Sequence, residues 1–280
     1  MLMITTFLDQ TNLPIVEQFN ILEEINHKNI SLRNVVEEIN ELKELVRNHQ
    51  IKVINYDSNI KSYDLYNDEI HDQNLHLFEI EVQKAKELKA IHILFEIPKV
   101  KDIITECEFL ENKVRDYIDI AKKYKIELVI KPTLGIKSNA YVYLLKQFKK
   151  TEIGMIFDTI HLYKNDESLL TSYRILKPYI KVLRVADIRK NIPVLIGYGE
   201  LKLLEIFKSF LRDKYNGIVE LDTNLLELID KTEKVNFFKK LSKKYKINRN
   251  AKDALEEKIG TLELKDIIDN QLQVLEKVFK

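Results

Sequence analysis

The sequence is short of the residues that mark disulfide-rich folds, flexible linkers and phosphate-binding loops. Among 280 residues there are one cysteine, six glycines and five prolines. The single cysteine, Cys107, excludes a disulfide within the chain and fits a reducing cytoplasm, where we expect the protein to reside. No stretch rich in proline, glycine or serine separates domains. No glycine precedes Gly135, so no early strand is followed by the G-x-G-x-x-G loop of a dinucleotide-binding fold.

An excess of charge of either sign is also missing. The 45 lysines and arginines nearly balance the 44 aspartates and glutamates, which gives a net charge of +1. No overall field therefore attracts nucleic acid or an anionic membrane, and we expect neither as a partner. The amino-terminal segment lacks the basic region and long apolar core of a signal peptide, and we expect no membrane span. With 45% hydrophobic residues, the chain can still bury a full core.

Short runs rich in β-branched and aromatic residues alternate with longer runs whose apolar residues recur at helical spacing. One such stripe joins Ile15, Phe19 and Leu22. Eight strands alternating with helices predict a parallel sheet closed into a (β/α)₈ barrel, and an open doubly wound sheet is the alternative. The expected strands are 3–8, 29–35, 51–56, 90–97, 126–131, 153–158, 180–187 and 217–222. The other expected helices follow stripes over 36–46 and 110–121 and occupy 72–89, 138–149, 167–178 and 199–214.

The chain continues well beyond the eighth expected strand. We expect residues 1–225 to form the barrel core, and residues 226–280 to form the closing helix and additional helices packed on the same domain. Two apolar stripes predict helices over 231–249 and 261–279. Their apolar faces suit packing on the barrel or on a second copy of the chain, so a homodimer is an expected assembly.

Four consecutive strands near the end of the barrel each carry one ionisable residue close to their carboxyl ends. Alternation places Lys131, Asp158, Arg184 and Glu220 on the strand faces that also carry Val129, Ile156, Val182 and Ile218. In a (β/α)₈ barrel these positions share one cavity at the mouth. Because an unpaired buried charge costs several kcal/mol, two cations beside two anions indicate a site. A purely structural charge network is the alternative.

Further polar residues flank this predicted mouth. His161 lies three residues after Asp158, and Glu96 ends the fourth expected strand. The loop 187–201, DIRKNIPVLIGYGEL, carries Asp187 and Arg189 and places a Gly-Tyr-Gly segment ahead of a helix. Backbone N–H groups in such a loop suit an anion such as a phosphate.

The order of these segments resembles the xylose-isomerase-like barrels of sugar and sugar phosphate isomerases and epimerases, a fold that also includes the endonuclease IV branch. The resemblance spans roughly residues 3–225. Its motifs are Asp158-Thr-Ile-His161 after strand 6, Arg184-Val-Ala-Asp187 with a following Gly-Tyr-Gly on strand 7, and Gly217-Ile-Val-Glu220 on strand 8.

The resemblance implies one divalent metal, held by a Glu from strand 5, an Asp from strand 6, a His from strand 7 and a Glu from strand 8. It also implies that the two glutamates move a proton through an enediolate. By position, Asp158 and Glu220 match ligands, and His161 matches a substrate contact. Lys131 stands in place of the strand-5 Glu, and Arg184 in place of the strand-7 His.

Lysine and arginine are cations, whereas a divalent metal takes oxygen or imidazole ligands. We therefore predict no metal and no other cofactor, although the family usually binds Mn, Mg, Zn or Co. We expect Lys131 and Arg184 to take over the space and charge of the metal and to pair with Asp158 and Glu220. The endonuclease branch needs several histidines for its metal cluster, and this pattern is missing.

The leading functional hypothesis is a metal-independent isomerase or epimerase of a small sugar or sugar phosphate. Lys131 serves there as a base or Schiff-base amine and Glu220 as a base. An alternative is a non-catalytic relative that binds a small anionic ligand or a partner through the mouth. A metal enzyme with an unusual ligand set ranks third. The predicted catalytic residues are Lys131, Asp158 and Glu220, and the predicted substrate-binding residues are Glu96, His161, Arg184, Asp187 and Arg189.

Overall fold

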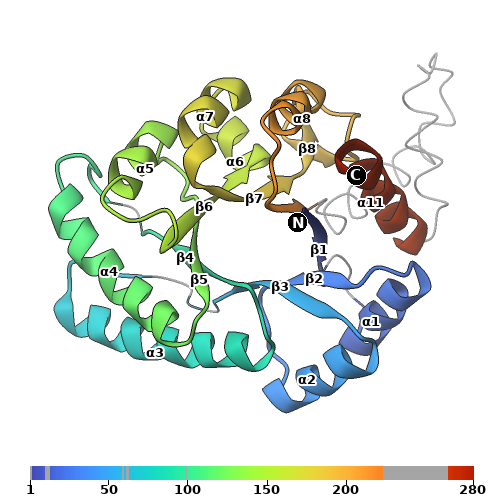
Figure 1. Cartoon of the computed structure of the whole chain (residues 1–280), viewed down its shortest axis with the longest axis horizontal. Coiled ribbons are helices and arrows are strands. Elements are labelled where there is room, and N and C mark those ends of the chain that lie inside the picture. The colour runs from blue at the N-terminus through green and yellow to red at the C-terminus, as the bar shows by residue number, and fades with distance from the viewer. Residues whose placement is uncertain (1, 10–12, 59, 61–62, 99, 223–263) are drawn as a thin grey trace, which may run out of the picture.

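A computed structural model describes residues 2–9, 13–58, 60, 63–98, 100–222 and 264–280. Eight parallel strands close a barrel in the order β1-β10-β7-β6-β5-β4-β3-β2, with β2 again beside β1 (Figure 1). This confirms the predicted (β/α)₈ architecture. The barrel strands are β1 Met3–Phe7, β2 Asn29–Leu32, β3 Lys52–Asp57, β4 His92–Glu96, β5 Glu127–Lys131, β6 Ile153–Asp158, β7 Ile180–Val185 and β10 Ile218–Leu221.

Helices surround the barrel on its outer side (Figure 1). In the described ranges, none of them is long and apolar enough to cross a membrane. They are α1 Ile15–Glu24, α2 Ile39–Asn48, α3 Asp68–Glu87, α4 Cys107–Lys123, α5 Ser138–Leu145, α6 Thr159–Lys164, α7 Leu169–Leu176, the single 3₁₀ turn η1 Lys177–Tyr179, α8 Leu203–Arg212 and α11 Leu264–Phe279.

Several boundaries differ from the sequence-based expectation; the strand expected over 29–35 ends at Leu32, and the helix expected from residue 72 begins at Asp68. The strand expected over 180–187 ends at Val185, and Asp187 begins a small antiparallel hairpin of β8 Asp187–Arg189 and β9 Ile192–Val194. The helix expected from residue 199 begins at Leu203. Helix α2 begins at Ile39 and leaves Val36 89% exposed, so the apolar stripe of 36–46 starts one turn late. The short helix α6 was not predicted.

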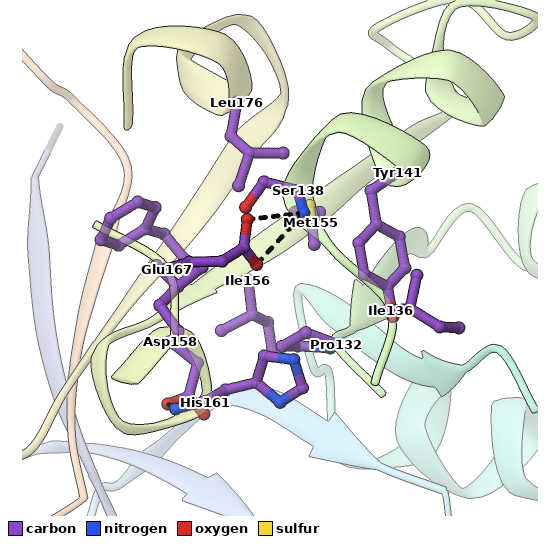
Figure 2. A pocket seen from close by; sticks show the side chains of 12 residues that line it. Pro132, Ile136, Ser138, Tyr141, Met155, Ile156, Asp158, His161, Glu167 and Leu176 are labelled. Atoms are coloured by element: carbon purple, nitrogen blue, oxygen red, sulfur yellow. Dashed lines mark hydrogen bonds between the residues drawn. The ribbon is translucent and has the colours of Figure 1, made fainter. Parts of the chain in front are cut away.

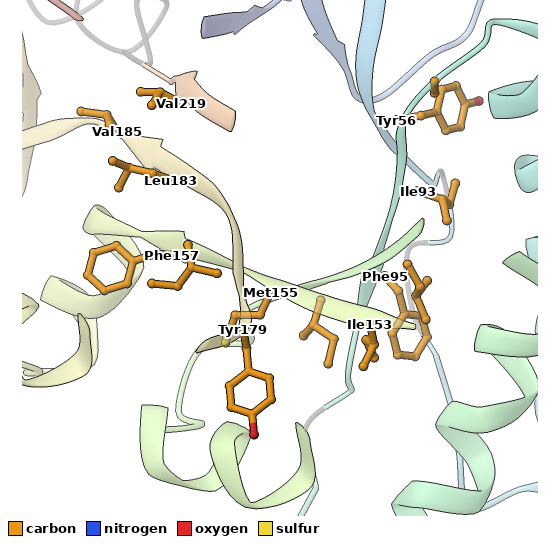
Figure 3. Close-up of a cluster of buried hydrophobic side chains, with 14 of the residues drawn as sticks. Tyr56, Ile93, Phe95, Ile153, Met155, Phe157, Tyr179, Leu183, Val185 and Val219 are labelled. Carbon is orange, nitrogen blue, oxygen red and sulfur yellow. The ribbon is translucent and has the colours of Figure 1, made fainter. Parts of the chain in front are cut away.

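The main core lies between the outward faces of the strands and the helices (Figure 3). Helix α8 shows why the chain folds this way, because its buried residues Leu203, Ile206, Phe207 and Phe210 recur at helical spacing. Phe210 meets Phe157 of β6 edge-on, with ring centroids 5.6 Å apart. Aromatic contacts of this kind fix the angle at which a helix lies on the barrel.

A second apolar cluster fills the inside of the barrel. It includes Val129, Ile156, Val182 and Ile218, the residues expected to share strand faces with the four mouth charges. Ile54 and Leu94 complete it, with Met3 packed against it. The inward direction predicted for each of these four strands is therefore confirmed.

Helix α11 closes the barrel beside β1 (Figure 1). Its buried stripe contains Ile267, Ile268, Leu272 and Leu275, which confirms the helix expected over 261–279 with a start at Leu264. Phe279 contacts Phe207 of α8, with ring centroids 5.2 Å apart. The helix expected over 231–249 lies outside the described residues.

Candidate functional site

Charged side chains gather at the carboxyl ends of the barrel strands. The strand register sets Glu96 beside Lys131, Asp158 beside Arg184, and Arg184 beside Glu220. The structure thus places five predicted residues on neighbouring strands and adds five that the sequence analysis did not single out. The added residues are Asp9, Arg33, Asn55, Asp57 and Asp222.

Arg184 lies between two carboxylates inside the mouth. Its Nε is 2.5 Å from Oε2 of Glu220, and its Nη1 is 3.8 Å from Oδ2 of Asp158. Glu220 has no exposed surface and Arg184 is 7% exposed. Burial opposes the charge on Arg184, but Glu220 and Asp158 outweigh it and raise the pKa of the guanidinium. The predicted pairing of Arg184 with these two acids is confirmed.

Glu220 is held from its other side by a chain of buried polar groups. Asn55 Nδ2 donates to Oε1 of Glu220 at 2.6 Å and to Oγ of Ser31 at 3.1 Å. Oδ1 of Asn55 lies 2.9 Å from Nδ1 of His92. Both oxygens of Glu220 are therefore engaged, one by Arg184 and one by Asn55. A buried charge needs such partners, because an unsatisfied one is costly.

Lys131 does not pair with Asp158 or Glu220, and that expectation was wrong. Its Nζ lies 2.9 Å from Oδ2 of Asp57 and 3.3 Å from Oε2 of Glu96. On the side of β5 away from β6, the barrel places β4 next to β5 and β3 beyond β4. The lysine leans toward the two acids that end those strands.

A third cation, Arg33, follows β2. Its Nε donates to both oxygens of Asp9, at 2.9 and 2.8 Å, and its Nη1 lies 2.9 Å from Oδ2 of Asp222. Its Cζ lies 3.9 Å from the ring centroid of Phe7, and that of Arg184 lies 4.9 Å from the same centroid. The sequence carries a signal for these residues, because Asp9, Arg33 and Asp222 are ionisable and lie within two residues of the ends of β1, β2 and β10.

Among the described residues of the mouth, three cations are each shared by two carboxylates. Since Arg184 already lies between Asp158 and Glu220, and Lys131 stands at the third ligand position, these residues do not fit a divalent metal. Within the described residues, no three His, Cys, Asp or Glu side chains cluster as metal ligands.

His161 lies on α6 beside Asp158, whose Oδ1 accepts from the His161 backbone N–H at 2.9 Å and caps the helix. Asn165 fixes the ring, because its Oδ1 accepts from Gly135 and its Nδ2 donates to the carbonyl of Ile136. That Nδ2 also lies 2.9 Å from His161 Nε2, which must then accept, so the proton of the neutral ring is on Nδ1. Burial lowers the pKa of His161 and raises that of Asp158.

A cavity of about 10 Å³ adjoins Asp158 and His161, which is about the space for one water molecule. Figure 2 shows it with Pro132 close to the imidazole ring. At its far side, Glu167 accepts two hydrogen bonds from the backbone N–H of Ser138, at 3.0 and 3.2 Å. The cavity therefore separates the barrel mouth from the start of α5.

Asp187, a predicted substrate contact, is 1% exposed and lies in the loop after β7. Its carboxylate accepts from the backbone N–H groups of Ile188, Gly197 and Gly199 at 2.9 to 3.0 Å. The anion that this glycine loop binds is thus its own aspartate. Arg189 is half-buried at the end of β8, where the hairpin turns.

The sequence matches the family model of the xylose isomerase-like TIM barrel over residues 19–240. The structure resembles a sugar phosphate isomerase/epimerase from Parabacteroides distasonis (TM-score 0.64, 13% identity, 81% of this chain and 90% of that one). An AP endonuclease, family 2, from Brucella melitensis is also similar (TM-score 0.69, 13% identity, 80% and 93%). So is 3-keto-D-glucoside 4-epimerase from E. coli (TM-score 0.64, 15% identity, 79% and 91%).

A search of curated proteins gives no match. The structural likenesses, at such low identity, show the fold alone. The family model covers most of the chain, and its description agrees with the closed eight-stranded parallel barrel. The chain therefore belongs to the xylose isomerase-like TIM barrel family.

Proposed function

We propose that this chain binds a small carbohydrate at the barrel mouth without a divalent metal and without the metal-dependent isomerase chemistry of its family. One observation supports this most directly. The guanidinium of Arg184 lies 2.5 Å from Glu220 and 3.8 Å from Asp158, the two acids that match metal ligands. The guanidinium of Arg184 occupies the space between these two carboxylates, engages their oxygens and repels a second cation at that place.

The positions that match the two proton-moving glutamates also support a binding role. A general base must come within hydrogen-bond distance of the proton that it takes. Glu220 has no exposed surface, and both of its oxygens are engaged. Lys131 at the other position is a cation bound to Asp57 and Glu96. Neither side chain is available for the family's proton transfer.

The choice of carbohydrate rests on the family and on the polar character of the mouth. Several similar structures are those of sugar isomerases or epimerases, among them a D-psicose 3-epimerase with D-tagatose from Clostridium cellulolyticum H10. That chain is 14% identical to this one, so the ligand class is part of the proposal. A mouth lined by carboxylates and guanidinium groups suits hydroxyl groups, which both donate and accept hydrogen bonds.

A second candidate, a metal-free isomerase or epimerase, is favoured by one separate observation. Asp158 and His161 line the same cavity, and burial shifts their pKa values in opposite directions, upward for the acid and downward for the imidazole. Such a divergence is how one site holds a protonated acid beside a neutral base. In this candidate Nε2 of His161 gives up its hydrogen bond from Asn165 and takes a proton from the carbon next to the carbonyl, and Asp158 protonates the oxygen.

One experiment separates the two candidates. The full chain, purified with EDTA, is titrated by calorimetry with a panel of five- and six-carbon ketoses and aldoses. Any sugar that binds is then incubated with the protein in D₂O, and exchange of its C–H protons is followed by NMR. Binding without exchange supports the binding role. Exchange that is lost in Asp158→Asn supports the isomerase. Failure of the whole panel to bind would contradict both candidates.

A further inference from the structure

The ion pairs at the mouth leave two buried polar atoms without a hydrogen-bond partner among the described residues. These open atoms are Nη2 of Arg184 and Oδ1 of Asp222. The other atoms of these groups are engaged, because Nε of Arg184 contacts Glu220 and Oδ2 of Asp222 contacts Arg33. A guanidinium nitrogen can only donate, and an ionised carboxylate oxygen can only accept. A buried group of either kind is costly while it stays unpaired.

The side chains that carry these two atoms lie at the ends of the neighbouring strands β7 and β10. Asp222 directly follows β10, and its backbone N–H donates to the carbonyl of Val185 in β7 at 2.9 Å. Arg184 and Arg33, the latter bound to Asp222, both lie against the ring of Phe7, at 4.9 and 3.9 Å. Burial lowers the pKa of Arg184, and three anions together raise it more. Glu220 has the largest effect of the three, followed by Asp158 and then Asp222.

A hydroxyl group matches this pair of atoms, since it accepts one hydrogen bond and donates another. A phosphate or carboxylate group offers only acceptors and faces the open oxygen of Asp222 with a like charge. The charge of the ion pairs at the mouth acts in the same direction. Among the described residues they comprise three cations and six carboxylates, a net charge of −3 when all are ionised.

We propose that the mouth recognises an uncharged ligand rich in hydroxyl groups, an unphosphorylated carbohydrate or polyol. One hydroxyl oxygen of this ligand accepts from Nη2 of Arg184, and its proton is donated to Oδ1 of Asp222. The inference rests on the proposed carbohydrate-binding function and selects the free sugar over the sugar phosphate. It also differs from the small anionic ligand considered in the sequence analysis.

The test compares each free sugar with its own phosphate ester. Calorimetric titrations of the full chain use D-fructose beside D-fructose 6-phosphate, D-tagatose beside D-tagatose 6-phosphate, and D-xylulose beside D-xylulose 5-phosphate. The expected result is that a free sugar binds at least about tenfold more tightly than its ester. An ester that binds as tightly as the free sugar, or more tightly, overturns the inference but leaves the proposed function standing. No binding of any of the six compounds contradicts the proposed function itself.

Two matched variants test the hydroxyl contact. In Asp222→Asn an NH₂ group replaces the free carboxylate oxygen while the amide oxygen stays on Arg33, and we expect sugar binding to weaken by about tenfold, the effect of one hydrogen bond to a charged group. The control, Glu87→Gln, removes one carboxylate from the exposed ion pair with Lys43, outside the mouth. We expect Glu87→Gln to change the affinity by less than about threefold. Equal losses in the two variants would refute the contact, since a general charge effect explains them. Circular dichroism confirms that both variants are folded.

Discussion

Replacing Arg184 by methionine is expected to destabilise the protein strongly, because it leaves a buried carboxylate without its cation. Glu220 is fully buried, and its Oε2 lies 2.5 Å from Nε of Arg184. In Arg184→Met the glutamate keeps only the hydrogen bond from Asn55. Removing one partner of a buried ion pair typically costs about 3–5 kcal/mol, and we expect a loss of this size in the free energy of unfolding.

Urea unfolding followed by far-ultraviolet circular dichroism measures this loss, since the chain contains no tryptophan. The matched control is Lys43→Met, which breaks an ion pair with Glu87 whose two side chains are 42% and 46% exposed. Such a surface pair contributes about 0–1 kcal/mol. The double variant Arg184→Met/Glu220→Gln removes both charges and should be more stable than Arg184→Met alone. Equal losses in Arg184→Met and Lys43→Met would refute the reasoning.

Two further predictions concern the loop after β7 and the base of the barrel. Gly199→Ala should lower the free energy of unfolding by about 1–3 kcal/mol, because the added Cβ would lie 1.8 Å from Oδ1 of Asp187. Urea unfolding measures this loss. An unchanged midpoint would contradict the view that the hydrogen bonds to Asp187 hold this loop in place. Burial lowers the pKa of His27, so the unfolded chain binds more protons than the folded one as pH falls through about 6.5, and stability should fall between about pH 7.5 and 5.5. His27→Gln should flatten this dependence, whereas the same change at the exposed His76 should not.

The fold was predictable because the patterns that define it are local. Alternation along a strand set the inward direction of Lys131, Asp158, Arg184 and Glu220, and the structure confirms it for the apolar residue on each of the four faces. Helical stripes located the helices to within a few residues, except where tertiary contacts moved a boundary. The start of α8 is such a case, because the backbone of Leu201 and of the two glycines is drawn to Asp187.

The partners of the mouth residues were harder to predict, because they depend on contacts between segments far apart in the sequence. Lys131 pairs with Asp57, which lies 74 positions earlier, and Arg33 pairs with Asp222, which lies 189 positions later. Only the closed order of the strands decides which side chains meet. Asn55 donates a hydrogen bond to Glu220 inside the barrel. It carries no charge, so a search for ionisable residues near strand ends does not find it.

The most direct test of the account is a calorimetric titration of Mn²⁺ into the full chain, after metal has been removed with EDTA. The guanidinium of Arg184 lies between Asp158 and Glu220, the two acids that match metal ligands by the resemblance. We therefore expect no saturable binding of one Mn²⁺ per chain. Binding of one equivalent that disappears in Glu220→Gln would contradict this account.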